Sequence, residues 1–313
     1  MNSMNKEKKR GIRSPLFYVG DKYKLMPQLE KLFPTYIESF YDVFCGGGSA
    51  SININATNYY LNDIDSNIIA LHKHLIKKSE NMEECIKEMY KIIESYDLSH
   101  SEYIISDELK EYKEKFKKTY FARYNKNSYL KLRDDYNKNK KNYDYLYLLL
   151  VYGFNHMIRF NKKGEFNLPV GNVDWNKNVT NSLIDYANWV DESNIIISKG
   201  LDFEKFVLKN KYKENDFLYF DPPYLITFSD YNKFWNEEEE LRLYKLLDKL
   251  NAAGVKWGLS NMVKHKGKTN DILLEWSKKY NVFEIESNYI SRFDNTKKID
   301  SVEIYVSNHV EGE

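Results

Sequence analysis

The stretch Ser39-Phe40-Tyr41-Asp42-Val43-Phe44-Cys45-Gly46-Gly47-Gly48-Ser49 decides the fold of this chain. Its apolar part, 39–44, predicts a buried parallel strand, the three glycines predict a tight turn, and Ser49 can start a helix. A glycine-rich turn between a strand and a helix lets a ligand approach the backbone at the helix N-terminus. The stretch therefore predicts an α/β domain with a ligand site at this turn.

A second strand at 59–61 leads into Leu61-Asn62-Asp63, fifteen residues past the last glycine. A carboxylate at this place can accept hydrogen bonds from a ribose diol, which indicates a cofactor that contains a nucleoside. A merely structural glycine turn is the alternative. The glycine spacing is not G-x-G-x-x-G, and this disfavours a nicotinamide oxidoreductase.

The tetrapeptide Asp221-Pro222-Pro223-Tyr224 follows a third apolar run, Phe217–Phe220, and we predict that these four residues are catalytic. An aromatic amine is a poor nucleophile, because its lone pair is delocalised into the ring. The carboxylate of Asp221 and the carbonyl of Pro222 could accept hydrogen bonds from the amine and localise that lone pair. The prolines would hold both acceptors rigidly, and Tyr224 could stack on a base swung out of a duplex.

Further apolar runs predict strands at 195–198 and 256–260, an antiparallel pair at 282–286 and 302–306, and a helix over 237–250. Between 71 and 152 the pattern is helical instead. We therefore predict a Rossmann-like sheet with an inserted helical domain. The predicted boundaries are a flexible basic arm at 1–13, a catalytic domain formed by 14–66 and 179–313, and a target-recognition domain at 67–178.

Charge is distributed unevenly, although the whole chain carries a formal net charge of only +1. Between Lys110 and Asn172 there are 15 Lys and Arg against 6 Asp and Glu. A basic lobe of this kind is typical of a nucleic-acid contact, and a solvated set of helices is the alternative. Within the lobe, 153–171 predicts a β-hairpin whose strands, 157–160 and 165–168, flank a basic turn at 161–164. Such a ribbon can enter a DNA groove.

Composition restricts the remaining classes of function. Two cysteines are too few for a disulfide framework, and the histidines lack metal-site spacing, so we expect no bound metal. The longest apolar run is too short to span a bilayer, and the N-terminus lacks the apolar stretch of a signal peptide. We expect a soluble protein in the cytoplasm of a bacterial or phage-infected cell, without a membrane partner.

From about Pro15 to Val306 the sequence resembles the Dam family of DNA adenine methyltransferases, and its T-even bacteriophage members most. Tyr18-Val19-Gly20-Asp21-Lys22 is similar to the family's N-terminal cofactor segment, 42–49 to its glycine loop, and 221–224 to its catalytic tetrapeptide. The resemblance implies the class I methyltransferase fold and transfer of a methyl group from S-adenosylmethionine to adenine N6 in double-stranded DNA after base flipping. The family usually methylates GATC.

The resemblance also implies roles for single residues. Those predicted to bind the cofactor are Tyr18, Lys22, Phe44, Gly46, Asp63, Phe203, Asp221 and Tyr231. Those predicted to contact DNA are Phe154, which wedges into the duplex, and Asn155, Met157, Arg159 and Pro169 on the base-reading hairpin. One departure from the family is Asn172-Val173-Asp174, where a basic residue is usual, and this puts backbone clamping in doubt.

Two alternatives remain open on the residues. A methyltransferase for cytosine N4 would use the same kind of pocket. Asp rather than Ser before the two prolines resembles the adenine-specific enzymes and so favours adenine. A non-catalytic DNA-binding module is disfavoured by the intact tetrapeptide and Asp63. The sequence does not decide between a chain paired with a cognate restriction endonuclease, an orphan locus and a phage origin.

Overall fold

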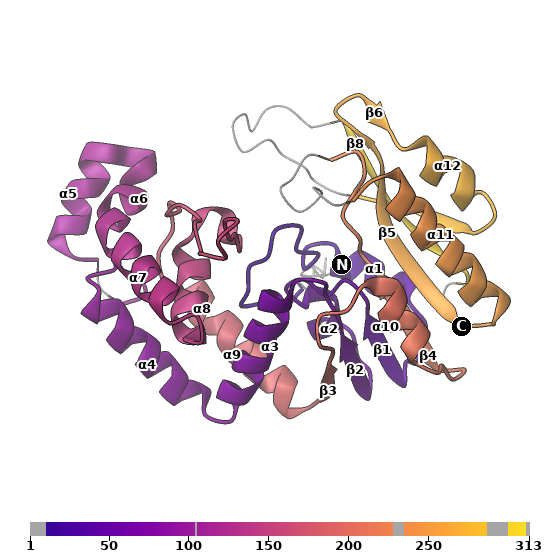
Figure 1. Cartoon of the computed structure of the whole chain (residues 1–313), viewed down its shortest axis with the longest axis horizontal. Helices are drawn as coiled ribbons and strands as arrows, with labels where there is room; N and C mark the ends of the chain where they lie inside the picture. Colours follow the sequence, from indigo (N-terminus) through magenta and orange to yellow (C-terminus); the bar gives the residue numbers. More distant parts are fainter. Residues whose placement is uncertain (1–10, 104, 228–234, 287–299, 311–313) are drawn as a thin grey trace, which may run out of the picture. The chain divides into compact units, whose positions relative to one another are not determined.

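The structure, a computed structural model, describes residues 11–103, 105–227, 235–286 and 300–310. The predicted basic arm lies almost entirely outside these residues. The chain divides into two compact units. One unit comprises Lys22–Ile64 and the chain from Ser193 onward, and it contains the sheet. The other comprises Ile12–Asp21 and Asp65–Glu192, and it is helical (Figure 1).

Within the described residues, the first unit holds a sheet with the strand order β3-β2-β1-β4-β5-β8-β7, and a short β6 pairs with β5. The strands are β1 Ser39–Asp42, β2 Asn58–Leu61, β3 Asn194–Ile197, β4 Asp216–Phe220, β5 Lys256–His265, β6 Lys268–Thr269, β7 Asn281–Ile285 and β8 Ser301–Ser307. Strands β3, β2, β1, β4 and β5 run parallel, whereas β8 pairs antiparallel with both β5 and β7. This is a mixed α/β unit with a mostly parallel sheet, consistent with a methyltransferase fold.

Burial explains why the central strands were readable from sequence. Every residue of β4 is buried, as expected of a parallel strand covered on both faces, which reads as a continuous apolar run. The predicted antiparallel pair is confirmed as β7 and β8. Two strand boundaries differ from prediction by more than one residue: β1 ends at Asp42 rather than Phe44, and β5 continues to His265, where its last residues pair with β6 and β8.

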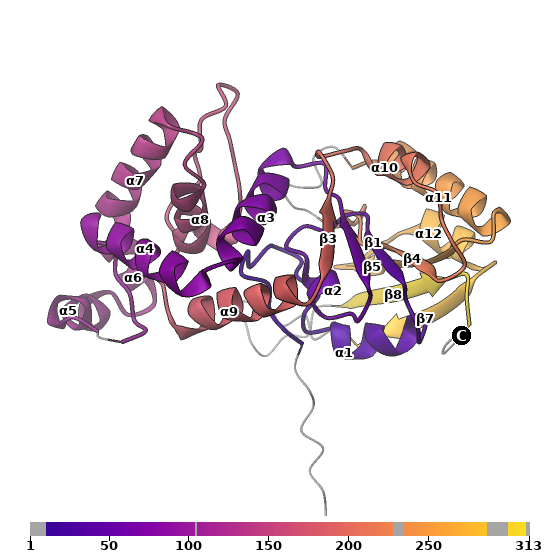
Figure 2. The ribbon, with the colours of Figure 1, turned by 90° about the horizontal axis from the view of Figure 1, so that it is seen from below.

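Helices cover both faces of this sheet (Figure 2). They are α1 Met26–Leu29, α2 Ser49–Ile52, α10 Phe203–Lys209, α11 Glu237–Ala252 and α12 Asp271–Ser277. One apolar cluster joins α10, α11 and α12 to the sheet through residues such as Phe206, Leu247 and Trp257. An aromatic group around Phe33, which ends the turn after α1, packs against Tyr219 and Tyr305. The sheet is therefore fixed from both sides, which makes its strand ends a rigid platform.

The helical unit is built from α3 Ser66–Ser79, α4 Met82–Ser95, α5 Asp107–Phe116, α6 Tyr120–Tyr124, α7 Lys126–Lys138, α8 Tyr143–Tyr152 and α9 Lys177–Asp191. Its centre is α8, because every residue from Leu146 to Tyr152 is buried and an all-apolar helix must be surrounded. Side chains of Asp65, Asn81, Ser106 and Asn142 cap α3, α4, α5 and α8, which sets where these helices begin.

The compact units do not follow the predicted domain boundaries at every point. The segment Ile12–Asp21 groups with the helical unit, whereas the sequence places 14–21 with the sheet. The reason is packing: the Tyr147 hydroxyl on α8 donates a hydrogen bond to the Pro15 carbonyl, and the Phe17 ring lies 5.2 Å from that of His156. The role of the helical unit in target recognition stays a prediction.

Candidate active site and nucleic-acid interface

The strand order reverses direction between β1 and β4, and ligands bind in open α/β sheets at the carboxyl ends of strands at such a switch point. The glycine turn follows β1 there, and the tetrapeptide beginning at Asp221 follows β4. Gly46 and Gly48 have φ values of 46° and 77°, a conformation that glycine adopts without strain. The two motifs that the sequence singled out thus lie side by side at the switch point.

Asp63 and Asn62, which follow β2, hold the glycine turn in place. The Gly46 N–H donates to the Asp63 carboxylate at 3.0 Å, and the Cys45 N–H donates to the Asn62 carbonyl at 2.8 Å. The buried Asn62 side chain donates to the carbonyls of Val43 and Leu201. Sequence analysis gave Asn62 no role, although it joins the turn after β1 to the segment after β3.

The Asp221 carboxylate lies in a compact charged cluster. Lys22 Nζ is 2.9 Å from Asp221 Oδ2 and 3.8 Å from Glu303 Oε1 on β8. The Tyr224 hydroxyl lies 3.2 Å from Asp221 Oδ1 and 2.7 Å from Glu303 Oε1. Lys22 and Glu303 expose only 8% and 1% of their side chains, and Asp221 exposes 18%. Of the two carboxylates, only Asp221 is therefore open enough to meet a substrate.

Local structure fixes the members of this cluster. The Lys22 carbonyl accepts hydrogen bonds from the N–H groups of Leu25 and Met26, so the backbone of Lys22 is tied to the start of α1. Pro222 is buried, and the two prolines restrict the backbone between Asp221 and Tyr224. The Thr227 N–H donates to the Tyr224 carbonyl and closes a turn. These contacts make the acceptors at 221 and 222 preorganised.

Burial raises the pKa of the Asp221 carboxyl above its ordinary value. The Lys22 ammonium opposes this effect by attraction and by its hydrogen bond, whereas the Glu303 charge adds to it and the Tyr224 hydroxyl opposes it. A carboxylate with a raised pKa binds protons more strongly, and for the same reason it is a better acceptor for an amine N–H. The ammonium of Lys22 thus favours the ionised form of Asp221 against the effect of burial.

Asp42, the last residue of β1, is a second buried carboxyl at the site. Its Oδ2 accepts the Ser51 hydroxyl of α2 at 2.8 Å. Burial raises the pKa of Asp42 to about 7, and the charges of Asp221 and Asp63 add to this, while the Ser51 hydroxyl lowers it. Asp42 thus links β1 to α2 beneath the glycine turn.

An aromatic group lies at the same strand ends. The ring of Phe44 has its centroid 5.4 Å from that of Phe203 and 5.7 Å from that of Trp235, and the latter two rings are 5.9 Å apart. Phe44 and Phe203 are predicted cofactor contacts, whereas Trp235 was missed. Tyr231, the remaining predicted aromatic contact, lies outside the described residues.

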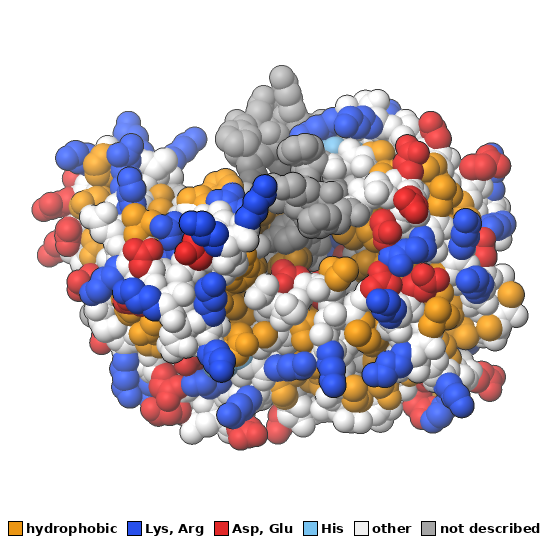
Figure 3. Space-filling view, viewed as in Figure 1, with side chains coloured by type: hydrophobic (Ala, Val, Ile, Leu, Met, Phe, Trp, Pro, Cys, Tyr) orange, Lys and Arg blue, Asp and Glu red, His pale blue; other side chains and the backbone are white. Residues whose placement is uncertain are grey.

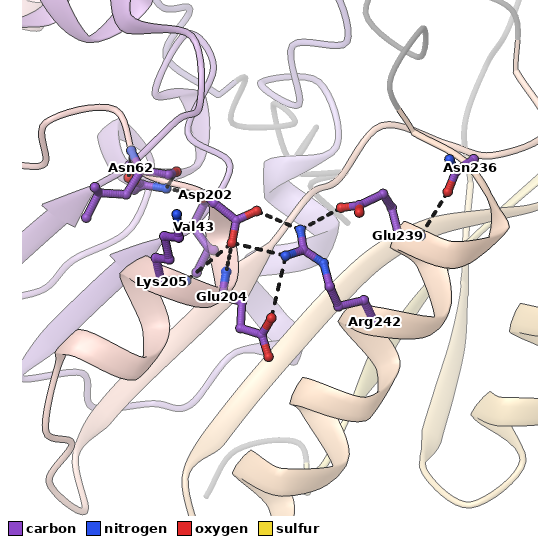
Figure 4. Close-up of polar contacts among 9 residues, drawn as sticks. Val43, Asn62, Asp202, Glu204, Lys205, Asn236, Glu239 and Arg242 are labelled. Carbon is purple, nitrogen blue, oxygen red and sulfur yellow. Dashed lines mark hydrogen bonds and ion pairs between the residues drawn. The ribbon is translucent and has the colours of Figure 1, made fainter.

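Arg242 on α11 points toward the side chains of Asp202, Glu204 and Glu239 (Figure 4). Its guanidinium lies 4.3 Å from the Phe203 ring centroid, in the geometry of a cation–π contact. Three carboxylates hold it there: Asp202 and Glu239, each at 2.6 Å, and Glu204 at 3.5 Å. Asp202 also accepts from the N–H groups at the start of α10, so it fixes the helix and the arginine together.

These residues fit a nucleoside cofactor. A carboxylate after β2, a glycine turn with positive φ angles and a set of aromatic faces all belong to one end of one sheet. Aromatic faces suit a purine ring, and the carboxylate suits a ribose diol. The structure therefore brings together Lys22, Phe44, Gly46, Asp63, Phe203 and Asp221 of the predicted cofactor set. Tyr18 belongs to the helical unit, and its cofactor contact stays a prediction.

In the helical unit, the predicted DNA-contacting residues follow the buried helix α8. Phe154 is 50% exposed, although it is a large apolar side chain. It begins a short 3₁₀ turn, η3 Phe154–His156, in which Asn155 and His156 have φ values of 54° and 51°. Non-glycine residues in this left-handed region are uncommon and are enriched at functional sites. Met157 is half-buried and Pro169 is exposed.

The predicted hairpin is only partly correct. The chain reverses at Asn161–Gly164, where the Gly164 N–H donates to the Asn161 carbonyl, but 157–160 and 165–168 are not regular strands. Pairing is limited to isolated bridges such as Phe160 with Phe166. Two backbone hydrogen bonds flank this bridge, from the Asn161 N–H to the Glu165 carbonyl and from the Asn167 N–H to the Arg159 carbonyl. The backbone groups of Phe166 face away from this pair and bond to the side chain of Asn137 on α7.

Arg159 lies on this loop with its guanidinium turned to Asn167. Its Nε donates to the Asn167 side chain at 3.0 Å and its Nη2 to the Asn167 carbonyl at 2.9 Å. Gly153 and Gly171 close the base of the loop, because a Cβ on Gly171 would lie 2.6 Å from the Gly153 carbonyl oxygen. Close packing at the base and the Asn167 contacts give Arg159 a defined position.

Basic side chains lie near α5 and α6 of the same unit, together with half-buried aromatic rings. The short turn η2 Lys117–Thr119 joins these helices, and Arg123 stacks on the Phe116 ring at 4.5 Å. Lys and Arg side chains gather on the visible face of this end (Figure 3). Asn172, at the departure from the family pattern, bonds to the Lys118 carbonyl and the Ala122 N–H. Asn172 thus has a structural contact next to a basic segment.

Neither a metal centre nor a membrane-spanning helix is found among the described residues. Across residues 11–103, 105–227, 235–286 and 300–310, no three or more His, Cys, Asp and Glu side chains form a group that could hold a metal ion. In the same ranges, the helices are too short or too polar to cross a membrane.

Comparison with known proteins identifies the class. Residues 18–290 match the model of the D12 class N6 adenine-specific DNA methyltransferases. The match covers most of the chain and includes both the glycine turn and the tetrapeptide. The chain belongs to this family, and membership implies a methyl donor of the S-adenosylmethionine type.

Individual relatives agree with the class. The chain is 36% identical over 306 residues to the type II methyltransferase M.FokI of Planomicrobium okeanokoites, covering 95% of this chain and 43% of that protein. It is 26% identical over 324 residues to the type II methyltransferase M1.LlaDCHI of Lactococcus lactis subsp. cremoris, with 99% of each covered. It is 25% identical over 162 residues to the DNA adenine methylase of Escherichia coli K12, with 51% and 48% covered. The chain thus spans less than half the length of M.FokI.

Proposed function

We propose that this chain transfers a methyl group from S-adenosylmethionine to the N6 amine of adenine in double-stranded DNA. The observation that carries the proposal is the Asp221 carboxylate, which directly follows β4 at the switch point of the sheet and lies beside Lys22 and Tyr224. Membership in the D12 class gives the same reaction.

The geometry accounts for activation of the amine. The Asp221 carboxylate and the Pro222 carbonyl are two acceptors on one rigid turn, and both can take hydrogen bonds from the two N–H groups of the target amine. These bonds strengthen as the nitrogen becomes tetrahedral, so they favour the transition state over the ground state. When bound, S-adenosylmethionine supplies an activated methyl group on a sulfonium. The ring of Tyr224, anchored through its hydroxyl, offers a stacking face for a flipped base.

The remaining residues of the site would bind and orient the cofactor. Asp63 would accept hydrogen bonds from the ribose diol, and it already aligns the Gly46 N–H of the turn. Phe44, Phe203 and Trp235 would enclose the purine, with Arg242 fixing Phe203. These are positioning roles, and they follow from where the side chains lie.

The helical unit is the part that we propose contacts DNA. Phe154 would wedge into the duplex, which fits its exposure on a strained turn. Asn155, Met157, Arg159 and Pro169 would read bases from the adjoining loop. The basic residues of the lobe at 110–172 would contact phosphates, and affinity should then fall steeply with salt.

The recognised sequence and the biological context remain predictions. GATC, like the likeness to T-even bacteriophage members, follows from the family resemblance of the motifs. Relatives of this chain are named as type II methyltransferases, which supports a restriction-modification context and a cognate endonuclease.

Incubation of the purified chain with methyl-labelled S-adenosylmethionine and unmethylated genomic DNA tests the proposal. Digestion of the DNA to nucleosides should place the label in N6-methyladenine. Label in N4-methylcytosine would replace adenine with cytosine as the target. Absence of label, with cofactor binding intact, would indicate a non-catalytic DNA-binding module.

A further inference from the structure

Glu303 is a buried carboxylate in the middle of a strand. It belongs to β8, where it lies opposite Met262 of β5 and Ile285 of β7, and it is 1% exposed. Its neighbour Ile304 and the next alternate residue, Val306, enter the apolar core beneath α11, so Glu303 points to the other face of the sheet. A carboxylate is unfavourable at such a place unless it is paired.

The partners of Glu303 belong to the candidate active site. Its Oε1 lies 2.7 Å from the Tyr224 hydroxyl and 3.8 Å from Lys22 Nζ. Asp221 lies near the same two groups, at 3.2 Å from the hydroxyl and 2.9 Å from the ammonium. Lys22 Nζ also lies 5.0 Å from the centre of the Tyr224 ring. Two carboxylates therefore compete for one ammonium and one hydroxyl.

The competition has a definite outcome for the hydroxyl. A tyrosine O–H carries one proton and can donate it fully to one acceptor. The shorter distance favours Glu303 as the acceptor of that proton, and the weaker contact with Asp221 Oδ1 leaves this oxygen able to accept from another donor. The ammonium is likewise shared, so Lys22 compensates the charge of Asp221 without taking all of its acceptor capacity.

We propose that Glu303 is a positioning residue of the methyl-transfer site, which anchors the Tyr224 hydroxyl and shares Lys22 so that Asp221 stays available to accept the target amine. The proposal rests on the proposed function. It assigns a role to a strand residue that lies outside both motifs. Without the Glu303 carboxylate, the Tyr224 proton would turn to Asp221, and Asp221 would no longer share Lys22 with Glu303.

Three variants separate the two contacts. Glu303→Gln keeps an oxygen that can accept the Tyr224 proton but removes the charge shared with Lys22. Glu303→Leu removes both contacts. Tyr224→Phe removes the hydroxyl and leaves both carboxylates. Glu284→Gln on β7 is the matched control, because it is the same substitution at an exposed carboxylate on the neighbouring strand.

Single-turnover methyl transfer at saturating cofactor and DNA is the first measurement, and calorimetric binding of S-adenosylmethionine is the second. We expect Glu303→Gln to lower the rate about tenfold or more while changing cofactor affinity by less than about threefold, because the lost interaction acts on Asp221 in the transition state. The Tyr224→Phe background should reduce the further effect of Glu303→Leu, because both changes remove one hydrogen bond. Glu284→Gln should behave as wild type.

A duplex with 2-aminopurine at the target position reports on the tyrosine. Loss of the anchor should alter the fluorescence of the flipped base in Glu303→Leu and Tyr224→Phe alike, and leave Glu303→Gln close to wild type. An active wild type with an unimpaired Glu303→Gln rate and fully additive effects would overturn the inference alone. A wild type that folds, binds cofactor and methylates no DNA would overturn the proposed function and this inference with it. If Glu303→Leu fails to fold, the Gln and Phe variants decide.

Discussion

Replacement of Lys22 by Met tests whether the charged cluster is as buried as the structure shows. Lys22 is 8% exposed and is 2.9 Å from Asp221 and 3.8 Å from Glu303. The variant would keep both carboxylates at this buried site and remove the ammonium that lies between them. Removal of one partner of a buried ion pair typically destabilises by about 3–5 kcal/mol. Because Asp221 is 18% exposed, we expect about 3 kcal/mol at pH 8.

The pH dependence of this loss has a definite sign. Burial already raises the folded-state pKa of Asp221 above its unfolded value, and loss of the ammonium would raise it further. When the pKa of a carboxyl is higher in the folded than in the unfolded state, the free energy of unfolding of the protein falls as pH rises through the folded-state pKa. The free energy of unfolding of the variant should therefore recover on acidification from pH 8 to pH 6, at up to about 1.4 kcal/mol per pH unit for one proton.

Urea unfolding of Lys22→Met and wild type at both pH values measures the difference. Asp221→Asn in the Lys22→Met background should restore part of the stability, because it removes one of the two carboxylate charges. Lys205→Met is the control, since Lys205 is an exposed lysine of the same unit, and its effect should stay within about 0.5 kcal/mol. A loss below about 1 kcal/mol at pH 8, or one that acidification does not reduce, would refute the reasoning.

Three further predictions concern other parts of the molecule. Asp42→Asn should raise the thermal unfolding midpoint at pH 8 and raise it much less at pH 4, because the substitution removes a buried charge that is present only at the higher pH. The gap between a pKa of about 7 and the ordinary 3.8 corresponds to at most roughly 4 kcal/mol, and Asn can still accept the Ser51 hydroxyl. A lower midpoint at pH 8 would contradict this prediction. Arg242→Leu should weaken S-adenosylmethionine binding about three- to tenfold in calorimetry, since it removes the cation–π contact on Phe203, and unchanged affinity would remove the positioning role. Arg159→Ala should cost about 1–3 kcal/mol on the cognate site, measured from methylation rates, and should relax discrimination at one G·C pair. An equal loss of rate on all site variants would instead make Arg159 a phosphate contact.

The features that sequence predicted best are those with local causes. The β4 run is buried throughout and ends in a carboxylate and two prolines, so both its burial and the turn after it can be read from adjacent residues. The glycine turn after β1 is similar, because positive φ angles at Gly46 and Gly48 require glycine. The antiparallel pairing of β7 with β8 follows from alternation at the end of the chain.

The features that sequence missed depend on residues distant along the chain. In the sequence, Glu303 is one charged residue in a strand of alternating polarity. Its role can be inferred only from the fold, because β8 places it next to Tyr224, which is 79 residues earlier in the chain. Trp235 and Arg242 could be placed near Phe203 only once α10 and α11 packed on the same face. The contact of Asn137, on α7, with both backbone groups of Phe166 also joins residues distant along the chain, and nothing near Phe166 in the sequence indicates it.

The central claim is that Asp221 at the end of β4 promotes transfer of a methyl group to adenine N6. Expression of the chain in a host that lacks DNA methylation, followed by single-molecule sequencing of the host DNA, tests it most directly, with Asp221→Asn as the paired variant. We predict N6-methyladenine within one short sequence for the wild type and none for the variant, which keeps the shape of the side chain but loses its charge. Methylated cytosine, absence of modified bases from the wild type, or equal methylation by Asp221→Asn would contradict the account.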